Sequence, residues 1–190
     1  MKKIGFLGFA IAIALVAGLE AQDSRPTSRP KSEKSASKYA IKLNDSSGAA
    51  HDTEKLKDTY IVLEWMSATC PAVIPHYRSG RMQKLSAKYT EKGVKWFGVC
   101  STGRQNNEGL QAFIAKYKVK HPILTDFDGK VGKKFGAKRT PQMFILKNGK
   151  ILYQGAIDDR TEDGVNYVAK ALDELLAGKE VSTPKTRPYG

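Results

Sequence analysis

The residues most able to do chemistry in this sequence are a cysteine and the proline after it. Cys70 lies four residues beyond an apolar run that ends at Met66, and Pro71 suits the first position of a helix because its missing N–H needs no partner there. A thiolate at a helix N-terminus is stabilised by unpaired backbone N–H groups and by the helix dipole. These residues predict a nucleophilic thiol in an exposed turn. The alternative is a small buried side chain without chemistry.

A second thiol, Cys100, ends another apolar run and is a candidate resolving residue. Neighbouring parallel strands lie about 4.8 Å apart and end at the same edge of a sheet, so Cys100 is expected near Cys70. The position also suits a buried residue at a strand end, because a disulfide needs a narrow range of Cα separations. Both interpretations stay open. His76, which follows Pro75, is expected to be a surface histidine rather than a partner of the thiolate.

The elements that must position these residues follow from apolar periodicity. Runs rich in β-branched and aromatic residues predict strands, and apolar residues at helical spacing predict helices. Asn148-Gly149 between two such runs predicts an antiparallel hairpin. The pattern predicts an α/β protein with a central mixed β-sheet flanked by helices and an added N-terminal strand pair. Strands are predicted at 60–66, 94–99, 122–125, 142–146 and 151–157, helices at 81–89 and 108–119, a basic amphipathic segment at 131–135, and a last helix at 165–176 with Val165, Val168, Leu172 and Leu176 facing inward.

The chain divides into four segments. Residues 1–21 have a basic start, an apolar middle and a small residue before Gln22, which is typical of a cleaved signal peptide. Residues 22–38, rich in Ser, Pro and Lys, predict a flexible basic linker; residues 39–178 form the folded domain, and 179–190 a C-terminal tail. The apolar run is shorter than a membrane-spanning helix, and an uncleaved N-terminal anchor is the alternative to cleavage. No apolar run after Ala21 is long enough to span a membrane, so no membrane association is expected after cleavage. The mature protein is expected in the periplasm or cell envelope, or secreted.

Composition limits the partners. The chain holds 32 Lys and Arg against 19 Asp and Glu, a formal net charge of +13. These basic residues are spread over nearly every segment without an aromatic binding motif, so no nucleic-acid partner is expected, whereas acidic partners are tolerated. No closely spaced pair of metal-ligating cysteines is present, so neither a metal nor another cofactor is expected. A basic adaptor that binds an anionic polymer is one rival interpretation.

Three stretches of the sequence carry a resemblance: Trp65 to Pro71, Arg139 to Ile145, and Asn148-Gly149-Lys150. Together they resemble the thioredoxin-like superfamily and, within it, the redoxin branch related to alkyl hydroperoxide reductase and thiol-specific antioxidant proteins. The resemblance covers about residues 39–178. In such proteins the proline opposite the reactive cysteine has a cis peptide bond, and Thr140-Pro141 stands where that proline belongs; an ordinary proline at a strand start is the alternative. The resemblance implies that Trp65, Pro71, Thr140 and Pro141 contact the substrate.

Two departures narrow the chemistry that the resemblance implies. Thioredoxins carry a second cysteine three residues after the first, and Val73 stands there, which excludes a dithiol exchange confined to one helix. Peroxiredoxins place Thr or Ser three residues before their cysteine, which Ser67 fits. Their active-site arginine, however, falls at Pro141 and leaves only the neighbouring Arg139 as a substitute. Peroxide reduction is therefore allowed but weakly supported.

We therefore expect an exported thiol oxidoreductase that acts on disulfides or peroxides through Cys70, with Cys100 or an external thiol as the resolving group. Ser67, Thr69 and Arg139 are candidate orienting or charge-stabilising residues. The expected partners are protein thiols or disulfides, or a peroxide, together with an external thiol reductant. Related chains continue into a short tail with another cysteine, which this sequence does not contain. The alternative is a non-catalytic thioredoxin-fold binding module that has lost the second cysteine.

Overall fold

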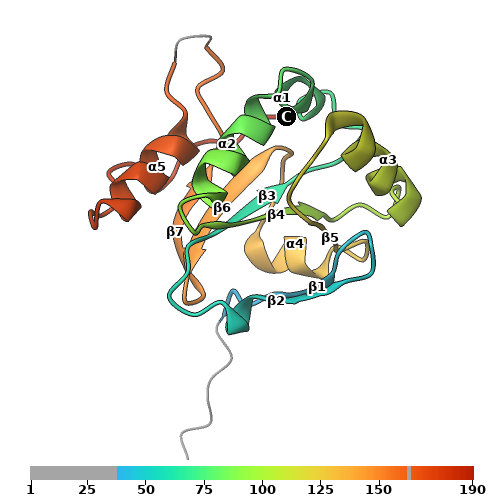
Figure 1. Ribbon diagram of the computed structural model, residues 1–190, viewed down its shortest axis with the longest axis horizontal. Coiled ribbons are helices and arrows are strands. Elements are labelled where there is room, and N and C mark those ends of the chain that lie inside the picture. Colours follow the sequence, from blue (N-terminus) through green and yellow to red (C-terminus); the bar gives the residue numbers. More distant parts are fainter. Residues whose placement is uncertain (1–37, 162–163) are drawn as a thin grey trace, which may run out of the picture. The chain divides into compact units, whose positions relative to one another are not determined.

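The computed structural model describes residues 38–161 and 164–190 (Figure 1). The predicted signal peptide, residues 1–21, and residues 22–37 of the predicted linker lie outside the described residues. In the part of the chain that is described, no helix combines the length and apolar character that a membrane crossing needs. The elements, in chain order, are β1 (Lys42–Asn44), β2 (Ala50–Asp52), a 3-10 turn (Thr53–Lys55), β3 (Ile61–Trp65), α1 (Ile74–Arg78), α2 (Arg81–Thr90), β4 (Lys95–Cys100), α3 (Asn107–Tyr117), β5 (Ile123–Thr125), α4 (Lys130–Phe135), β6 (Gln142–Lys147), β7 (Lys150–Gly155) and α5 (Tyr167–Leu176).

Five strands form one mixed sheet in the order β5-β4-β3-β6-β7. Strands β3, β4 and β5 run parallel to one another, as connections through helices allow. Strand β6 is antiparallel to both of its neighbours, β3 and β7. In the register of the central strand β3, Trp65 lies opposite Val99 of β4 on one side and Gln142 of β6 on the other. The ends of β3 and β4 and the start of β6 therefore meet at one edge of the sheet. The segments before and after these residues must form any site at that edge.

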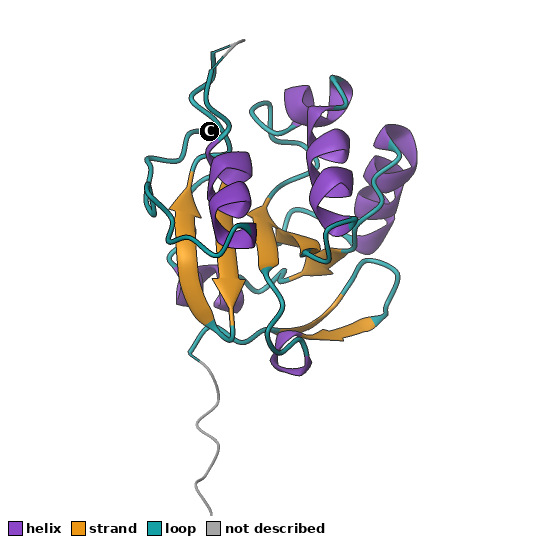
Figure 2. Ribbon diagram, turned by 60° about the vertical axis from the view of Figure 1, so that its left-hand side comes forward, coloured by secondary structure: helices purple, strands orange, loops and turns teal. Residues whose placement is uncertain are grey.

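Alternate residues of β3 enter two different cores, one on each face of the sheet. Val62 packs into the larger core with residues of α1, α2, α3 and α5, whereas Leu63 packs into the smaller core with Phe135 of α4. Figure 2 shows helices on both faces of the sheet. All five residues of β3 are buried, as expected for a central strand covered on both faces. The predicted α/β class is confirmed.

The predicted N-terminal strand pair is confirmed as the antiparallel hairpin of β1 and β2. Asp45 closes its turn, because the Oδ1 atom of Asp45 accepts the backbone N–H groups of Ser47 at 2.8 Å and Ala49 at 3.1 Å. The next backbone N–H, of Ser46, donates to the carbonyl of Ile123 in β5 at 2.9 Å. The hairpin thus covers an edge of the sheet that would otherwise be open.

Two local predictions are wrong. The helix after Cys70 begins at Ile74 rather than at Pro71, because the intervening residues form a turn. At α5, Val165 is exposed because the helix starts only at Tyr167. Its capping residue is Asn166, and Leu176 at the other end is exposed as well; the buried residues of this helix are Val168, Ala171, Leu172 and Leu175.

Candidate active site

Cys70 lies in a partly exposed turn between β3 and α1. Its backbone N–H donates to the carbonyl of Ser67 at 3.1 Å, and its carbonyl accepts the N–H groups of Val73 at 3.0 Å and Ile74 at 3.1 Å. These bonds fix the backbone around the thiol. Because α1 is only five residues long and begins after this turn, the turn, rather than a helix end, holds the sulfur in place.

The Cys70 thiol faces the loop that enters β6. Its Sγ atom donates to the carbonyl oxygen of Thr140 across 3.2 Å, and the Thr140-Pro141 peptide bond is cis, as the resemblance implied. Pro141 is buried, whereas Thr140 is partly exposed. The Gln142 side chain shapes this loop, because its Oε1 atom accepts the backbone N–H of Lys138 at 2.9 Å. Two segments far apart in the sequence thus meet at the thiol.

A pocket of about 420 Å³ opens at the thiol. Six of the site residues predicted from the sequence line this pocket: Trp65, Ser67, Thr69, Cys70, Arg139 and Thr140. Pro71, Pro141 and Cys100 do not line it, although Pro71 is exposed in the adjoining turn. The pocket residues that the sequence reasoning missed are Met66, Ser101, Thr102, Arg104, Ala137, Lys138 and Gly190.

Trp65, which lines this pocket, is linked to α4 by a chain of hydrogen bonds through Ser101 and Asp126. Its indole Nε1–H donates to Oγ of Ser101 at 2.9 Å, and the Ser101 hydroxyl donates to Oδ2 of Asp126 at 2.5 Å. Asp126 also accepts the backbone N–H groups of Val131 at 3.0 Å and Gly132 at 2.7 Å at the start of α4. Ser101 follows the end of a parallel strand, where the ligand-binding loops of such sheets lie. This position could have identified Ser101 as a site residue from the sequence.

Ser67 and Thr69 lie at the mouth of the pocket. Their hydroxyl oxygens are 3.3 Å apart, and Nε2 of Gln105 donates to Thr69 at 3.5 Å. Within the described residues, neither hydroxyl has a hydrogen bond to the Cys70 sulfur. Both hydroxyls therefore stay candidates for contact with a bound substrate.

Cys100 lies in a different environment from Cys70. It is a free thiol, fully buried in the larger core, and lies opposite Thr125 of β5 in the sheet register. Burial raises the pKa of the Cys100 thiol, and the nearby Asp126 carboxyl acts in the same direction, against a backbone hydrogen bond from Thr102. The thiolate that a resolving residue needs is therefore disfavoured in this conformation.

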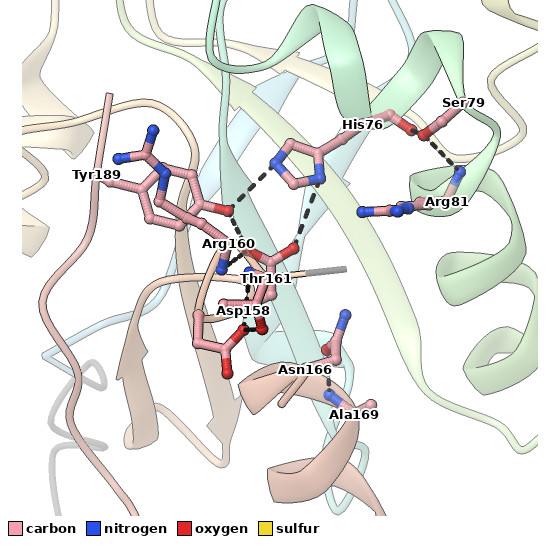
Figure 3. A network of polar contacts seen from close by, with 10 residues as sticks. His76, Ser79, Arg81, Asp158, Arg160, Thr161, Asn166, Ala169 and Tyr189 are labelled. Atoms are coloured by element: carbon pink, nitrogen blue, oxygen red, sulfur yellow. Dashed lines mark hydrogen bonds and ion pairs between the residues drawn. The ribbon is translucent and has the colours of Figure 1, made fainter. Parts of the chain in front are cut away.

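His76 is not the surface histidine that we predicted. Its side chain is only 11% exposed, because Tyr189 near the C-terminus covers it (Figure 3). The Tyr189 hydroxyl lies 3.2 Å from Nε2 of His76 and also donates to Oδ1 of Asp158. Burial lowers the pKa of His76; Asp158 opposes this effect, and Arg81 reinforces it.

The C-terminal segment is anchored along β7 and ends beside the pocket. The backbone of Gln154 pairs with it on both sides, accepting from the N–H of Thr186 at 3.1 Å and donating to the carbonyl of Pro184 at 3.0 Å. At its end, the carbonyl oxygen of Gly190 accepts Nη1 of Arg139 at 2.8 Å. Figure 1 shows this end of the chain beside α1. The predicted tail therefore contributes a wall of the Cys70 pocket.

A buried carboxyl lies beneath α1. Glu64 of β3 is completely buried, and the Tyr77 hydroxyl donates to its two oxygens at 3.0 and 2.9 Å. Burial raises the pKa of Glu64 to about 7, and it lowers the pKa of the neighbouring His121 to about 4. Sequence reasoning missed Glu64, although a lone acidic residue inside an apolar strand run was a visible signal.

Comparisons with known proteins show the family and the fold of this chain. The family model described as Redoxin matches residues 22–172. A thiol-disulfide oxidoreductase, ResA of Bacillus thuringiensis, is 27% identical over 90 residues, which cover 47% of this chain and 51% of that protein. The chain thus spans about half the length of the curated relatives that it matches.

Solved structures share the fold. A hypothetical protein of Sinorhizobium meliloti superimposes with a TM-score of 0.71 at 24% identity, covering 80% of this chain and 88% of that one. A secreted disulfide oxidoreductase of Mycobacterium tuberculosis, described as homologous to DsbE of E. coli, gives a TM-score of 0.52 at 21% identity over 60% and 81% of the two chains. With its thioredoxin-like sheet and the matched family model, this chain belongs to the redoxin family.

Proposed function

We propose that this protein is an exported thiol-disulfide oxidoreductase whose nucleophile is Cys70. The observation that carries the proposal is the placement of the Cys70 sulfur in an open pocket, 3.2 Å from the carbonyl oxygen of Thr140. A backbone carbonyl at that position can pair with an extended substrate chain and hold its disulfide against the thiol. Export rests on the sequence of residues 1–21.

The reaction is a thiol-disulfide exchange. The Cys70 thiolate attacks one sulfur of the substrate disulfide, a new S–S bond forms, and the old S–S bond breaks. The leaving sulfur carries the electron pair away and takes a proton from solvent. A second thiol then attacks the mixed disulfide, releases Cys70 and is itself oxidised. An external thiol suits this second step better than Cys100, because Cys100 is buried and its pKa is raised.

A disulfide substrate is favoured over a peroxide. Peroxide reduction needs a cation beside the reactive sulfur to stabilise the charge that develops as the O–O bond breaks. The buried Pro141 occupies the position of that arginine in the peroxiredoxins, and the neighbouring Arg139 instead donates to the carbonyl of Gly190. The backbone carbonyl of Thr140 in the pocket wall suits a peptide chain, whose N–H groups can donate to it.

Substitution of the two cysteines tests the proposal. We expect Cys70→Ser to lose more than about 100-fold of the insulin disulfide reductase activity measured with dithiothreitol as the external thiol, because the nucleophile is gone. Cys100→Ala is the matched control and should keep at least half of the activity. Trapping with a disulfide peptide should give a mixed disulfide at Cys70 in mass spectra. Full activity of Cys70→Ser would contradict the proposal and favour a non-catalytic binding module.

A further inference from the structure

The pocket at Cys70 is lined by cations and hydroxyls. Arg104, Lys138 and Arg139 contribute three basic side chains, and no carboxylate side chain is among the lining residues. All three residues are exposed. Within residues 38–161 and 164–190, neither Arg104 nor Lys138 is paired with a carboxylate, whereas lysines elsewhere, such as Lys130 with Asp128 at 2.7 Å, are. Arg139 is engaged, because its Nη1 atom donates to an oxygen of Gly190 at 2.8 Å. The positive charge of Arg104 and Lys138 is therefore available to a ligand.

The carboxyl group bonded to the pocket wall does not cancel this charge. Asp126 reaches the pocket only through the Ser101 hydroxyl and is itself buried. Asp126 also accepts the backbone N–H groups of Val131 and Gly132 in α4. These two donors partly balance its negative charge. Arg139 already binds an oxygen atom, the carbonyl of Gly190, at 2.8 Å. Arg104 and Lys138 therefore carry the positive charge that is available to a ligand at this pocket.

We infer that the substrate is an acidic peptide disulfide, with carboxylates on the residues that flank the reacting cysteine. This inference rests on the proposed function of Cys70. Carboxylates on the substrate would pair with Arg104 and Lys138 while the disulfide lies between the Cys70 sulfur and Thr140. The exchange itself is unchanged: the Cys70 sulfur replaces one sulfur of the peptide disulfide, and the displaced sulfur leaves as a thiolate.

Charge at the pocket acts on the encounter and on the bound complex. Opposite charges steer a ligand into a charged pocket and raise the association rate at least tenfold when several charges cooperate. Salt screens this attraction, because the Debye length falls from about 10 Å at 0.1 M to about 3 Å at 1 M. The preference for an acidic substrate must therefore weaken as salt is added.

Three matched peptides test the inference with the full mature chain. Each carries one cysteine activated as a mixed disulfide with 2-thiopyridine, flanked on both sides by two Glu, two Gln or two Lys residues. The leaving group is the same in all three, and its release is followed by absorbance. Every rate is divided by the rate for 2-mercaptoethanol, which removes the intrinsic reactivity of each peptide.

We expect the Glu peptide to react about tenfold faster than the Lys peptide at low salt, with the Gln peptide between them, and the ratio to approach one in 0.5 M NaCl. The double variant Arg104→Gln, Lys138→Gln should lose most of this ratio. Lys150→Gln removes one charge at the β6–β7 turn, at the opposite end of the sheet, and should keep it. Equal relative rates for the three peptides would overturn the inference and leave the proposed function standing. Release from none of them would overturn the proposed function itself.

Discussion

At the scale of single residues, two identical thiols differ because of their surroundings. Cys70 lies in an open turn against a carbonyl oxygen, whereas Cys100 is sealed in the core between two strands. The sequence places both at one edge of a parallel sheet, and that placement was correct. It could not distinguish the two environments, because exposure at the end of a strand depends on the loops and helices that cover it.

Glu64 and His121 show the cost of burying titratable groups together. The Tyr77 hydroxyl lies between them, 2.9 Å from Oε2 of Glu64 and 3.3 Å from Nε2 of His121. Burial raises the pKa of Glu64 to about 7 and lowers that of His121 to about 4, so both shifts favour the neutral forms. The two groups act oppositely on stability as the pH changes.

Glu64→Gln tests this balance. Between pH 4.5, where the unfolded carboxyl titrates, and about 7, only the unfolded state releases the Glu64 proton, so this group lowers stability as pH rises. His121 raises stability as pH rises between about 4 and 6.5. Without Glu64, the free energy of unfolding from urea titrations should have a slope between pH 5 and 6 that is more positive by about 1 kcal/mol per pH unit. His121→Gln should shift the slope in the negative direction. An unchanged slope in Glu64→Gln would show that the carboxyl is ionised in the folded protein.

At the scale of elements, strands were predicted more reliably than the segments between them. The run from Tyr60 to Met66 is apolar because it is buried on both faces, and such a pattern survives in any sheet order. The helix after Cys70 was predicted to start at Pro71, three residues before the start of α1 at Ile74, because a helix of five residues is too short for an apolar period that would fix its start. His76 was misjudged for a different reason: Tyr189, which covers it, lies 113 residues away in the sequence. No local pattern records such a contact.

The effect of the C-terminal segment on access to the pocket can be measured by weakening its contacts. Tyr189→Phe deletes the hydroxyl that contacts both His76 and Asp158, leaving two partly buried polar groups with one partner fewer. We expect the free energy of unfolding to fall by about 1–2 kcal/mol. We also expect Cys70 to react several-fold faster with a bulky maleimide, because Gly190 lines the pocket.

A matched control separates these two effects. Tyr60→Phe deletes a hydroxyl that donates to the carbonyl of Leu175 at 3.1 Å, away from the C-terminal segment. It should cost a similar amount of stability and leave maleimide labelling unchanged. Equal labelling rates in both variants and in the parent protein would show that the segment does not limit access to Cys70.

At the scale of the whole molecule, the fold could be read from the sequence, whereas the charges that surround the candidate site could not. Cys70 and Thr140-Pro141 are recognisable as a pair because the sequence resembles the thioredoxin-like superfamily, in which a cis proline lies opposite the reactive cysteine. Arg104 and Lys138 come from two loops with no motif, and only the folded chain brings them to the same pocket. Their role depends on whether carboxylates elsewhere in the chain pair with them. A chain with a net charge of +13 has too few carboxylates to pair with all of its basic side chains.

Salt should therefore change stability and reactivity in opposite directions. A net charge of +13 makes the folded state repel itself, and screening relieves that repulsion. Raising NaCl from 0.05 to 0.3 M at pH 7 should raise the midpoint of thermal unfolding by about 2–4 °C, equivalent to about 1 kcal/mol. Over the same range, the rate of Cys70 with the Glu peptide should fall several-fold while that with the Gln peptide stays constant. Scanning calorimetry and thiopyridone release measure the two effects on one sample. A falling midpoint would mean that ion pairs such as Lys88 with Asp173, 3.5 Å apart at the surface, outweigh the net repulsion.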